Sequence, residues 1–203
     1  MKRFLATACA VGAAFSLTGC LNTSESAPTT VQGVMDFFEK EEVNCFTDMT
    51  MDFWGAKIVS TSEIDYSKSK TEVTTTYAGV SSTEVNFMEI KGDKQTTYTQ
   101  DASGNWLAES VDYENSESES FFEEITATDF VKQENGDWLY SNDVSDPYYG
   151  DYTETITMIF TDGAFEVIFS TTYVDEGVSV TTDDLIIKCY AFGKASVTLP
   201  TVA

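Results

Sequence analysis

The sequence predicts a mainly β (α+β) protein: a curved antiparallel meander sheet, or half-barrel, of about nine strands packed on one N-terminal helix. Three observations lead to this prediction. Apolar residues show helical spacing in one early segment. Thr, Val, Tyr, Ile and Phe dominate the rest of the chain, and these residues suit pleated, half-buried surfaces. Short turns containing Gly separate the β segments, and such short connections join antiparallel neighbours.

The chain begins with a segment typical of export. Lys2 and Arg3 precede an apolar stretch at 4–17 that is too short to span a bilayer as a permanent helix. A polar stretch rich in Ser and Thr follows, and its composition is that of a tether. We therefore expect a signal peptide at 1–19, a tether at 20–30 and one globular β-rich domain at 31–203.

The end of the apolar stretch carries a recognisable motif. Leu17-Thr18-Gly19-Cys20 resembles the bacterial lipobox, in which the signal peptide is cut before the Cys and a diacylglyceryl group is attached to its sulfur. The resemblance implies lipidation at Cys20 and a protein anchored to a bacterial cell membrane, facing the extracytoplasmic side. An ordinary signal peptide with a chance Cys is the alternative.

The single helix is expected at 31–43, with Thr29 or Thr30 as its cap. One apolar stripe runs along it, formed by Val31, Val34, Met35 and Phe38. Two interpretations of the stripe remain open. The helix packs on the sheet, or it binds a partner.

A loop containing Phe53 and Trp54 is expected to join this helix to the β region. Alternation of apolar and polar residues, for example at 152–160 and 164–174, predicts strands with one covered face. The 116–130 region is expected to form a short helix or an irregular strand. Strands are expected at 56–63, 70–77, 83–91, 94–101, 105–113, 137–141, 152–161, 164–174 and 178–191, with a short terminal strand at 194–199.

This layout resembles a known group of proteins. A lipobox, a polar tether, one early amphipathic helix and a meander of Thr-rich strands are similar to bacterial lipoproteins of the LolA and LppX type. The segment from Asp129-Phe130-Val131 to Gly136-Asp137-Trp138-Leu139-Tyr140 also resembles a recurring segment of Gram-positive lipoproteins. The resemblance implies a bent sheet around a hydrophobic cavity, and lipid or lipopeptide handling.

Composition excludes several classes of function. The formal net charge is −23, which disfavours binding to nucleic acid. No His is present, so a Ser-His-Asp triad and a His-dependent zinc site are both excluded. Arg3 is the only arginine and would leave with the signal peptide, so the Arg fork that usually clamps anions would be missing. We expect a non-enzymatic protein without a cofactor, attached to the membrane through its lipid alone.

Two cysteines remain after Cys20. In an oxidising compartment Cys45 and Cys189 can form a disulfide, which would close a long loop and restrain the unfolded chain. Two buried free thiols are the alternative. A catalytic Cys is disfavoured because no His is available to activate it.

Clustered acids suggest two minor alternatives. Asp143, Asp146 and Asp151 could hold calcium, although their spacing does not match an EF-hand. The acidic stretch at 109–124 could supply the paired carboxylates of a glycosidase, although a solvated acidic loop explains it better.

The leading functional expectation is an apolar ligand, a lipid or acylated molecule, held between helix and sheet. The alternative is a cell-surface interaction or scaffold protein with an unknown protein partner. Aromatic residues in strands can serve the core or line a ligand site. The candidate ligand or core residues are Val34, Met35, Phe38, Trp106, Trp138, Phe165 and Phe169.

Overall fold

The computed structural model describes residues 26–40, 43–53, 55–113, 122, 124–148 and 150–202. It contains helix α2 (Val31–Phe38) and a 3₁₀ turn η1 (Ala127–Asp129). The remaining elements are β1 (Asn44–Phe53), β2 (Ala56–Asp65), β3 (Lys68–Tyr77), β4 (Val80–Lys91), β5 (Lys94–Gln100), β6 (Trp106–Asp112), β7 (Val131–Lys132), β8 (Trp138–Asp146), β9 (Gly150–Thr161), β10 (Ala164–Asp175) and β11 (Val178–Tyr190).

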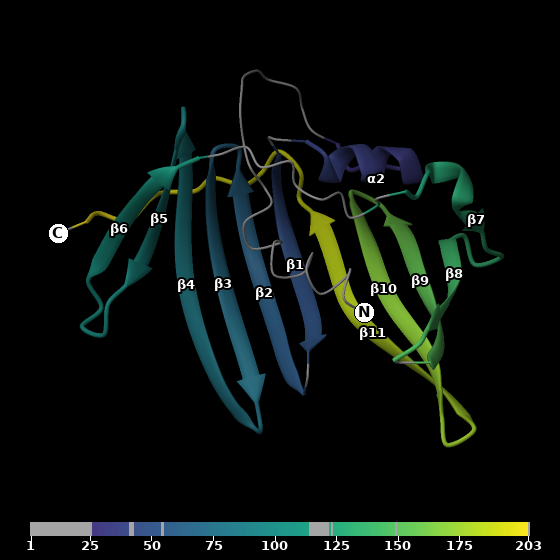
Figure 1. The fold of residues 1–203 in the computed structure, drawn as a ribbon. Coiled ribbons are helices and arrows are strands. Elements are labelled where there is room, and N and C mark those ends of the chain that lie inside the picture. The colour runs from purple at the N-terminus through teal and green to yellow at the C-terminus, as the bar shows by residue number, and fades with distance from the viewer. Residues whose placement is uncertain are drawn as a thin grey trace.

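All eleven strands belong to one curved antiparallel sheet with the order β6-β5-β4-β3-β2-β1-β11-β10-β9-β8-β7 (Figure 1). The predicted fold class is therefore confirmed, with eleven strands in place of about nine. Neighbours in the sheet are neighbours in sequence except at one place. There β1 pairs with β11, which joins the two meanders through residues far apart in the chain.

Helix α2 is shorter than the expected 31–43 and ends at Phe38. The Thr30 side chain accepts a hydrogen bond from the Gly33 backbone N–H at 3.1 Å, so Thr30 is the N-cap. The helix ends where the apolar stripe gives way to Glu39 and Lys40, which have no core to face. Among the described residues, no helix has the length and apolar character needed to cross a membrane.

Strand β1 lies where the sequence predicted a loop, so this part of the prediction was wrong. Its side chains alternate in the way strands do: Cys45 and Met51 are buried, and Asp48 and Asp52 point to the other face. Asp and Asn are weak strand formers, and their presence in this segment concealed the strand. Pairing with strands on both sides overrides that weakness.

Two further segments differ from expectation. Residues 194–199 form no strand and instead follow the end of β11 as irregular chain. In the described part of 116–130, η1 is followed by the two-residue strand β7. Residues 114–121 and 123 lie outside the described residues.

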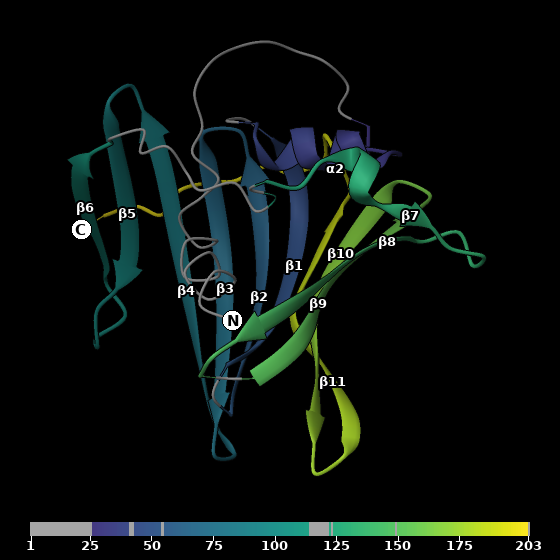
Figure 2. The same cartoon turned by 45° about the vertical axis from the view of Figure 1, so that its right-hand side comes forward.

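The main core lies between α2 and strands β9, β10 and β11. It contains the buried side chains of the helix, including Val34 and Phe37, and those of the sheet, including Ile156, Phe165 and Ile187. Figures 1 and 2 show α2 at one end of these strands and of β1, away from β3 to β6. The helix therefore packs on the sheet, and one half of the sheet extends beyond it.

Candidate functional site

Side chains fill the interface between α2 and the sheet. The Phe37 ring lies 5.3 Å from Phe165 and 5.6 Å from Phe192, measured between centroids, in edge-to-face contacts. Phe38 makes a similar contact with Phe122 at 5.8 Å. Of the predicted ligand or core residues, Val34, Met35, Phe165 and Phe169 are buried here and Phe38 packs against them. They form close-packed core.

Strand register extends this helix-side face across the whole sheet. Phe165 contacts the helix and lies opposite Cys189 in β11. Cys189 lies opposite Thr47 in β1, and Thr47 lies opposite Ser62 in β2. Because directly opposed residues share a face and side chains alternate along each strand, the registers assign every position of β2 to β6 to one face or the other. We call the face shared with Phe165 the helix-side face.

The helix-side face of β2 to β6 is almost free of charge. Within these strands, all of which the structure describes, Glu84 and Glu109 are the only charged side chains on it. Half of the other positions are Ser, Thr, Asn or Gln, and half are apolar. The apolar members are Ala56, Ile58, Ile64, Val73, Tyr77, Val80, Met88, Ile90, Leu107 and Val111.

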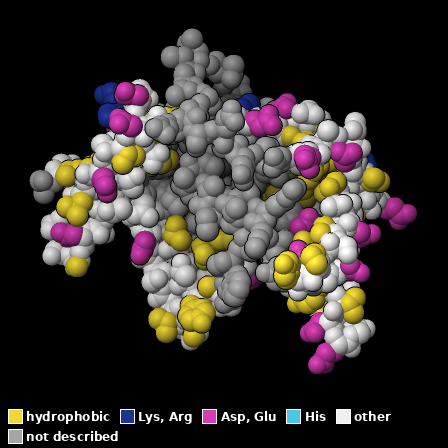
Figure 3. Space-filling model, viewed as in Figure 1, with side chains coloured by type: hydrophobic (Ala, Val, Ile, Leu, Met, Phe, Trp, Pro, Cys, Tyr) yellow, Lys and Arg dark blue, Asp and Glu magenta, His cyan; other side chains and the backbone are white. Residues whose placement is uncertain are grey.

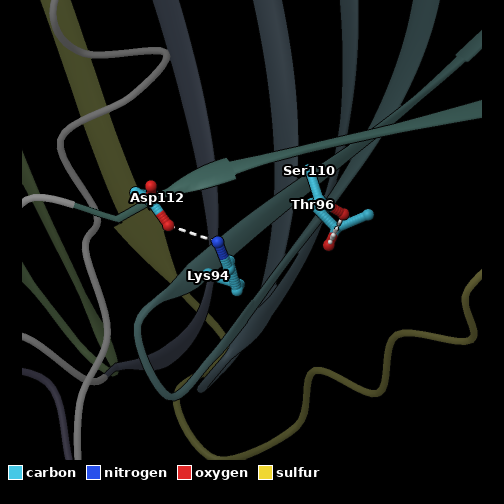
Figure 4. A network of polar contacts seen from close by, with 4 residues as sticks. All are labelled: Lys94, Thr96, Ser110 and Asp112. Atoms are coloured by element: carbon cyan, nitrogen blue, oxygen red, sulfur yellow. Dashed lines mark hydrogen bonds and ion pairs between the residues drawn. The ribbon is translucent and has the colours of Figure 1, made fainter.

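The opposite face of the same strands carries the charges. Figure 4 shows an example at the edge of the sheet: Lys94 in β5 forms an ion pair with Asp112 in β6, beside a 2.8 Å hydrogen bond between Thr96 and Ser110. The charged residues on this face are Lys57, Glu63, Asp65, Lys68, Lys70, Glu72, Glu89, Lys91, Lys94 and Asp112. Charge is therefore segregated between two faces of one sheet.

Apolar side chains on the helix-side face reach solvent. Tyr77 is 62% exposed, Val80 74% and Leu107 52%. In Figure 3, viewed as in Figure 1, the visible Lys atoms lie near the margins of the molecule. Two hydroxyls on this face, those of Ser62 and Thr71, bond to each other at 3.0 Å. The surface therefore offers apolar contact and uncharged hydroxyls, and little for an ion.

On β8 and β9 the helix-side face carries Tyr140 and Tyr152 beside the acidic Asp146 and Glu154. Burial raises the pKa of Tyr140, and the negative charges of Asp129 and Glu154 raise it further. Burial likewise raises the pKa of Tyr152, helped by Glu154 and Asp146. Both side chains lie on the helix-side face, since Tyr140 pairs with Ile156 and Tyr152 with Val144. Their phenols stay neutral hydroxyls at physiological pH.

The two predicted tryptophans lie on different faces. Trp138 lies on the helix-side face, packs against the core, and has the Lys132 ammonium 5.9 Å from its ring centroid. Trp106 lies on the opposite face, where it meets Phe87 edge-to-face at 5.2 Å. Grouping Trp106 with residues between helix and sheet was therefore wrong, because register turns its side chain away.

Cys45 and Cys189 lie together on the helix-side face where β1 meets β11. Both are fully buried, and each sulfur lies 3.8 Å from the Thr47 hydroxyl. Burial raises the pKa of the Cys189 thiol well above its usual value, and the neighbouring Cys45 raises it further. The structure thus brings the two predicted partners into one buried cluster. The disulfide stays a prediction.

The three aspartates of the calcium hypothesis do not converge. Asp143 and Asp151 point to the face opposite α2, where they accept hydrogen bonds from Thr153 and Ser145 at 2.8 and 2.6 Å. Asp146 points to the helix-side face and caps the Tyr148 backbone N–H at 2.7 Å. Across the described residues, no group of three or more Asp, Glu, Cys or His side chains is placed to hold a metal ion.

The acidic stretch lies partly outside the described residues. Glu109 and Asp112 are described, and they point to opposite faces of β6. Cys20 and Trp54 also fall outside the described residues. The segregation of charge, in contrast, was not predicted, although alternation within 68–91 could have indicated it once the strand faces were assigned.

Comparison with known proteins adds no relative. No protein-family model, curated protein or solved structure matches the chain.

Proposed function

We propose that this chain is a lipid-anchored, extracytoplasmic protein of a bacterial cell membrane that binds an uncharged, largely apolar ligand on the helix-side face. The ligand class is a lipid or an acylated molecule, and the role is non-enzymatic. The single observation that carries the proposal is the segregation of charge across β2 to β6, in a chain with 34 acidic residues.

Physical chemistry links that observation to an apolar ligand. Covering a charged side chain with a hydrocarbon chain strips its water, which costs several kcal/mol for an unpaired ion, whereas a hydroxyl already bonded to another costs little. Apolar contact contributes about 25 cal/mol per Å² removed from water. A face that combines Ile58, Val73 and Met88 with uncharged hydroxyls, such as the bonded pair of Ser62 and Thr71, gains this term without the penalty of covering an ion.

The position of the ligand differs from the sequence-based expectation. Because Phe37, Phe38 and Phe165 fill the space under α2, we place the ligand beside the helix, along β2 to β6. Lipidation of Cys20 and the tether at 20–30 supply the membrane attachment in this proposal. The ligand would then be held near, and not within, the bilayer.

Two adjacent threonines in β3 allow a matched test. Thr75 points to the helix-side face and Thr74 to the opposite face, and both are half-buried. The full chain is purified from membranes in a mild detergent, and co-purified lipid is measured by native mass spectrometry. We expect bound lipid in the wild type, about tenfold less in Thr75→Lys, and no change in Thr74→Lys. Equal loss in both variants, or no lipid in the wild type, would overturn the proposal.

A protein partner at the cell surface is the second candidate function. It is favoured by one observation: edge strand β6 exposes Leu107 and Val111 on the helix-side face. Cross-linking in cells from a photoreactive residue at position 107 tests it. A discrete cross-linked protein band, together with lipid-free wild-type protein, would favour this function over lipid binding.

A further inference from the structure

The face opposite α2 contains an open depression of about 480 Å³. The outer positions of β1 and β11 form its floor. The turn between β9 and β10 and the chain that follows β11 form its walls. Its lining includes Asp48, Asp162, Lys188, Tyr190, Ala191 and Lys194.

Hydrogen bonds hold the wall that follows β11 in place. The Gly193 backbone N–H donates to the Asn44 carbonyl at 2.8 Å, and the Lys194 N–H donates to the Ala191 carbonyl at 3.2 Å. Ala191 adopts a left-handed conformation with φ 52°, which a residue with a Cβ rarely does. Surrounding structure must fix such a residue, so this wall is formed before any ligand arrives.

The floor presents an ordered carboxylate. Asp48 Oδ1 accepts hydrogen bonds from the Tyr190 hydroxyl at 3.3 Å and the Thr61 hydroxyl at 3.1 Å. Among the described residues, none donates a hydrogen bond to its Oδ2. Tyr190 in turn stacks on Phe46, with ring centroids 5.8 Å apart. The Asp48 carboxylate is therefore held by two neutral hydroxyl donors, and its Oδ2 is left to accept a hydrogen bond from a further donor.

Two lysines supply the opposite charge. Lys188 lies directly across from Asp48 in the register of β1 and β11, and Lys194 lies on the wall. Both are exposed, and within the described part of the chain neither forms an ion pair or side-chain hydrogen bond. With Asp48 and Asp162, the depression holds two ammonium groups and two carboxylates.

We propose that this depression binds a small zwitterion, with the anionic group on Lys188 and Lys194 and the ammonium group on Asp48. The volume falls in the range of small-molecule sites. A purely anionic ligand would be repelled by the net charge of −23, and a purely cationic one would meet the two lysines. A zwitterion of no net charge avoids both costs. The site is separate from the helix-side face and does not depend on the function proposed there.

Three matched peptides test the charge requirement without any mutation. Glycylglycine carries both charges, acetyl-glycylglycine lacks the ammonium group, and glycylglycinamide lacks the carboxylate. Calorimetry on the full chain in a non-ionic detergent should show glycylglycine binding about tenfold more tightly than either derivative. O-phosphoethanolamine serves as a fourth probe. Tighter binding of this probe would identify a lipid headgroup as the source of the zwitterion, whereas weaker binding would identify free amino acids or short peptides.

A pair of substitutions locates the site. Lys188→Gln should weaken glycylglycine binding about tenfold, because it removes a charge-assisted hydrogen bond. Lys91→Gln makes the same charge change on exposed β4 and should leave affinity unchanged. Equal affinity for all three peptides, equal effects of the two substitutions, or no binding by glycylglycine would each overturn the proposal.

Discussion

Asn44 shows how one buried side chain can fix the chain beyond the last strand. Its Nδ2 donates hydrogen bonds to Asp65 and to the Ala195 carbonyl, both at 3.0 Å, and its Oδ1 accepts one from the Ala195 N–H at 2.8 Å. The same segment donates backbone N–H groups to Glu63 and Asp65. Side chains of β1 and β2 thus satisfy the backbone of residues 195–197, which takes the place of the strand expected there.

Asn44→Ala should therefore lower the free energy of unfolding by about 2–3 kcal/mol, because it removes three hydrogen bonds and leaves buried partners unsatisfied. Urea denaturation measures the change. Asn105→Ala is the control, since Asn105 bonds to Asp101 at an exposed turn, and it should cost less than about 1 kcal/mol. Similar losses in both variants would show that the Asn44 contacts do not hold the end of the chain.

The buried thiols predict a pH dependence. The raised pKa of Cys189 keeps it protonated when folded, and the thiolate is the reactive form. Reduced, folded protein should therefore resist iodoacetamide at pH 7, and unfolded protein should be labelled at Cys45 and Cys189. Mass spectrometry measures the labelling, and rapid labelling of folded protein would contradict the prediction.

The free energy of unfolding should also depend on pH. Because unfolding lets the Cys189 thiol ionise above pH about 8.5, the free energy of unfolding should fall as pH rises beyond that value.

At the scale of elements, the hairpin of β10 and β11 contains an irregularity that a carboxylate stabilises. Register shifts between Phe169 and Ser170, and at this point Asp184 accepts hydrogen bonds from Thr171 and Thr182 at 2.5 and 2.9 Å. Ser170 bonds to Asp183 at 2.8 Å. A bulge of this kind redirects the strand, and its unpaired groups need such partners.

Thr171→Val should destabilise the protein by about 1.5–3 kcal/mol, because the part-buried Asp184 loses a charge-assisted hydrogen bond. Thr172→Val is the matched neighbour: Thr172 bonds to Thr181 at the exposed surface, and its loss should cost less than about 1 kcal/mol. Denaturant midpoints compare the two. A larger effect at Thr172 would show that the carboxylate does not stabilise the bulge.

How well the strands could be predicted from the sequence differed from one strand to another. Strands with β-branched and aromatic residues, such as β9 and β10, were predicted nearly at their observed bounds because alternation and composition agree. Strand β1 was missed because Asn and Asp, which are depleted in strands, occupy three of its ten positions, and tertiary pairing overrides that preference. The face of Trp106 could not be predicted, because a residue's face depends on register across several strands, which no local pattern contains.

The candidate sites were harder to predict because they depend on pairing between strands that are far apart in the sequence. The cluster of Cys45, Thr47 and Cys189 and the charged depression at Asp48 both need β1 beside β11, a pairing between segments more than a hundred residues apart. The sequence identified Cys45 and Cys189 because they are the two cysteines that follow the predicted lipidation site at Cys20. Nothing local to Asp48 or Lys188 distinguished them from other surface charges.

At the scale of the whole molecule, the excess of 34 acidic over 11 basic residues affects stability. Exposed pairs such as Lys94–Asp112 contribute little, whereas unpaired carboxylates repel one another across the surface. Folding brings these charges closer together than they are in the extended chain. The folded state therefore carries a net electrostatic penalty at neutral pH.

Salt should relieve that penalty. Raising NaCl from about 0.01 M to 1 M shortens the Debye length from about 30 to 3 Å, so the urea midpoint at pH 7 should rise. Urea is the right denaturant because guanidinium chloride would itself screen the charges. Near pH 4.1, the isoelectric point, repulsion largely disappears and the same salt step should change the midpoint much less. A midpoint that falls with salt at pH 7 would show that attractive pairs, and not the excess of carboxylates, dominate the electrostatics of the folded state.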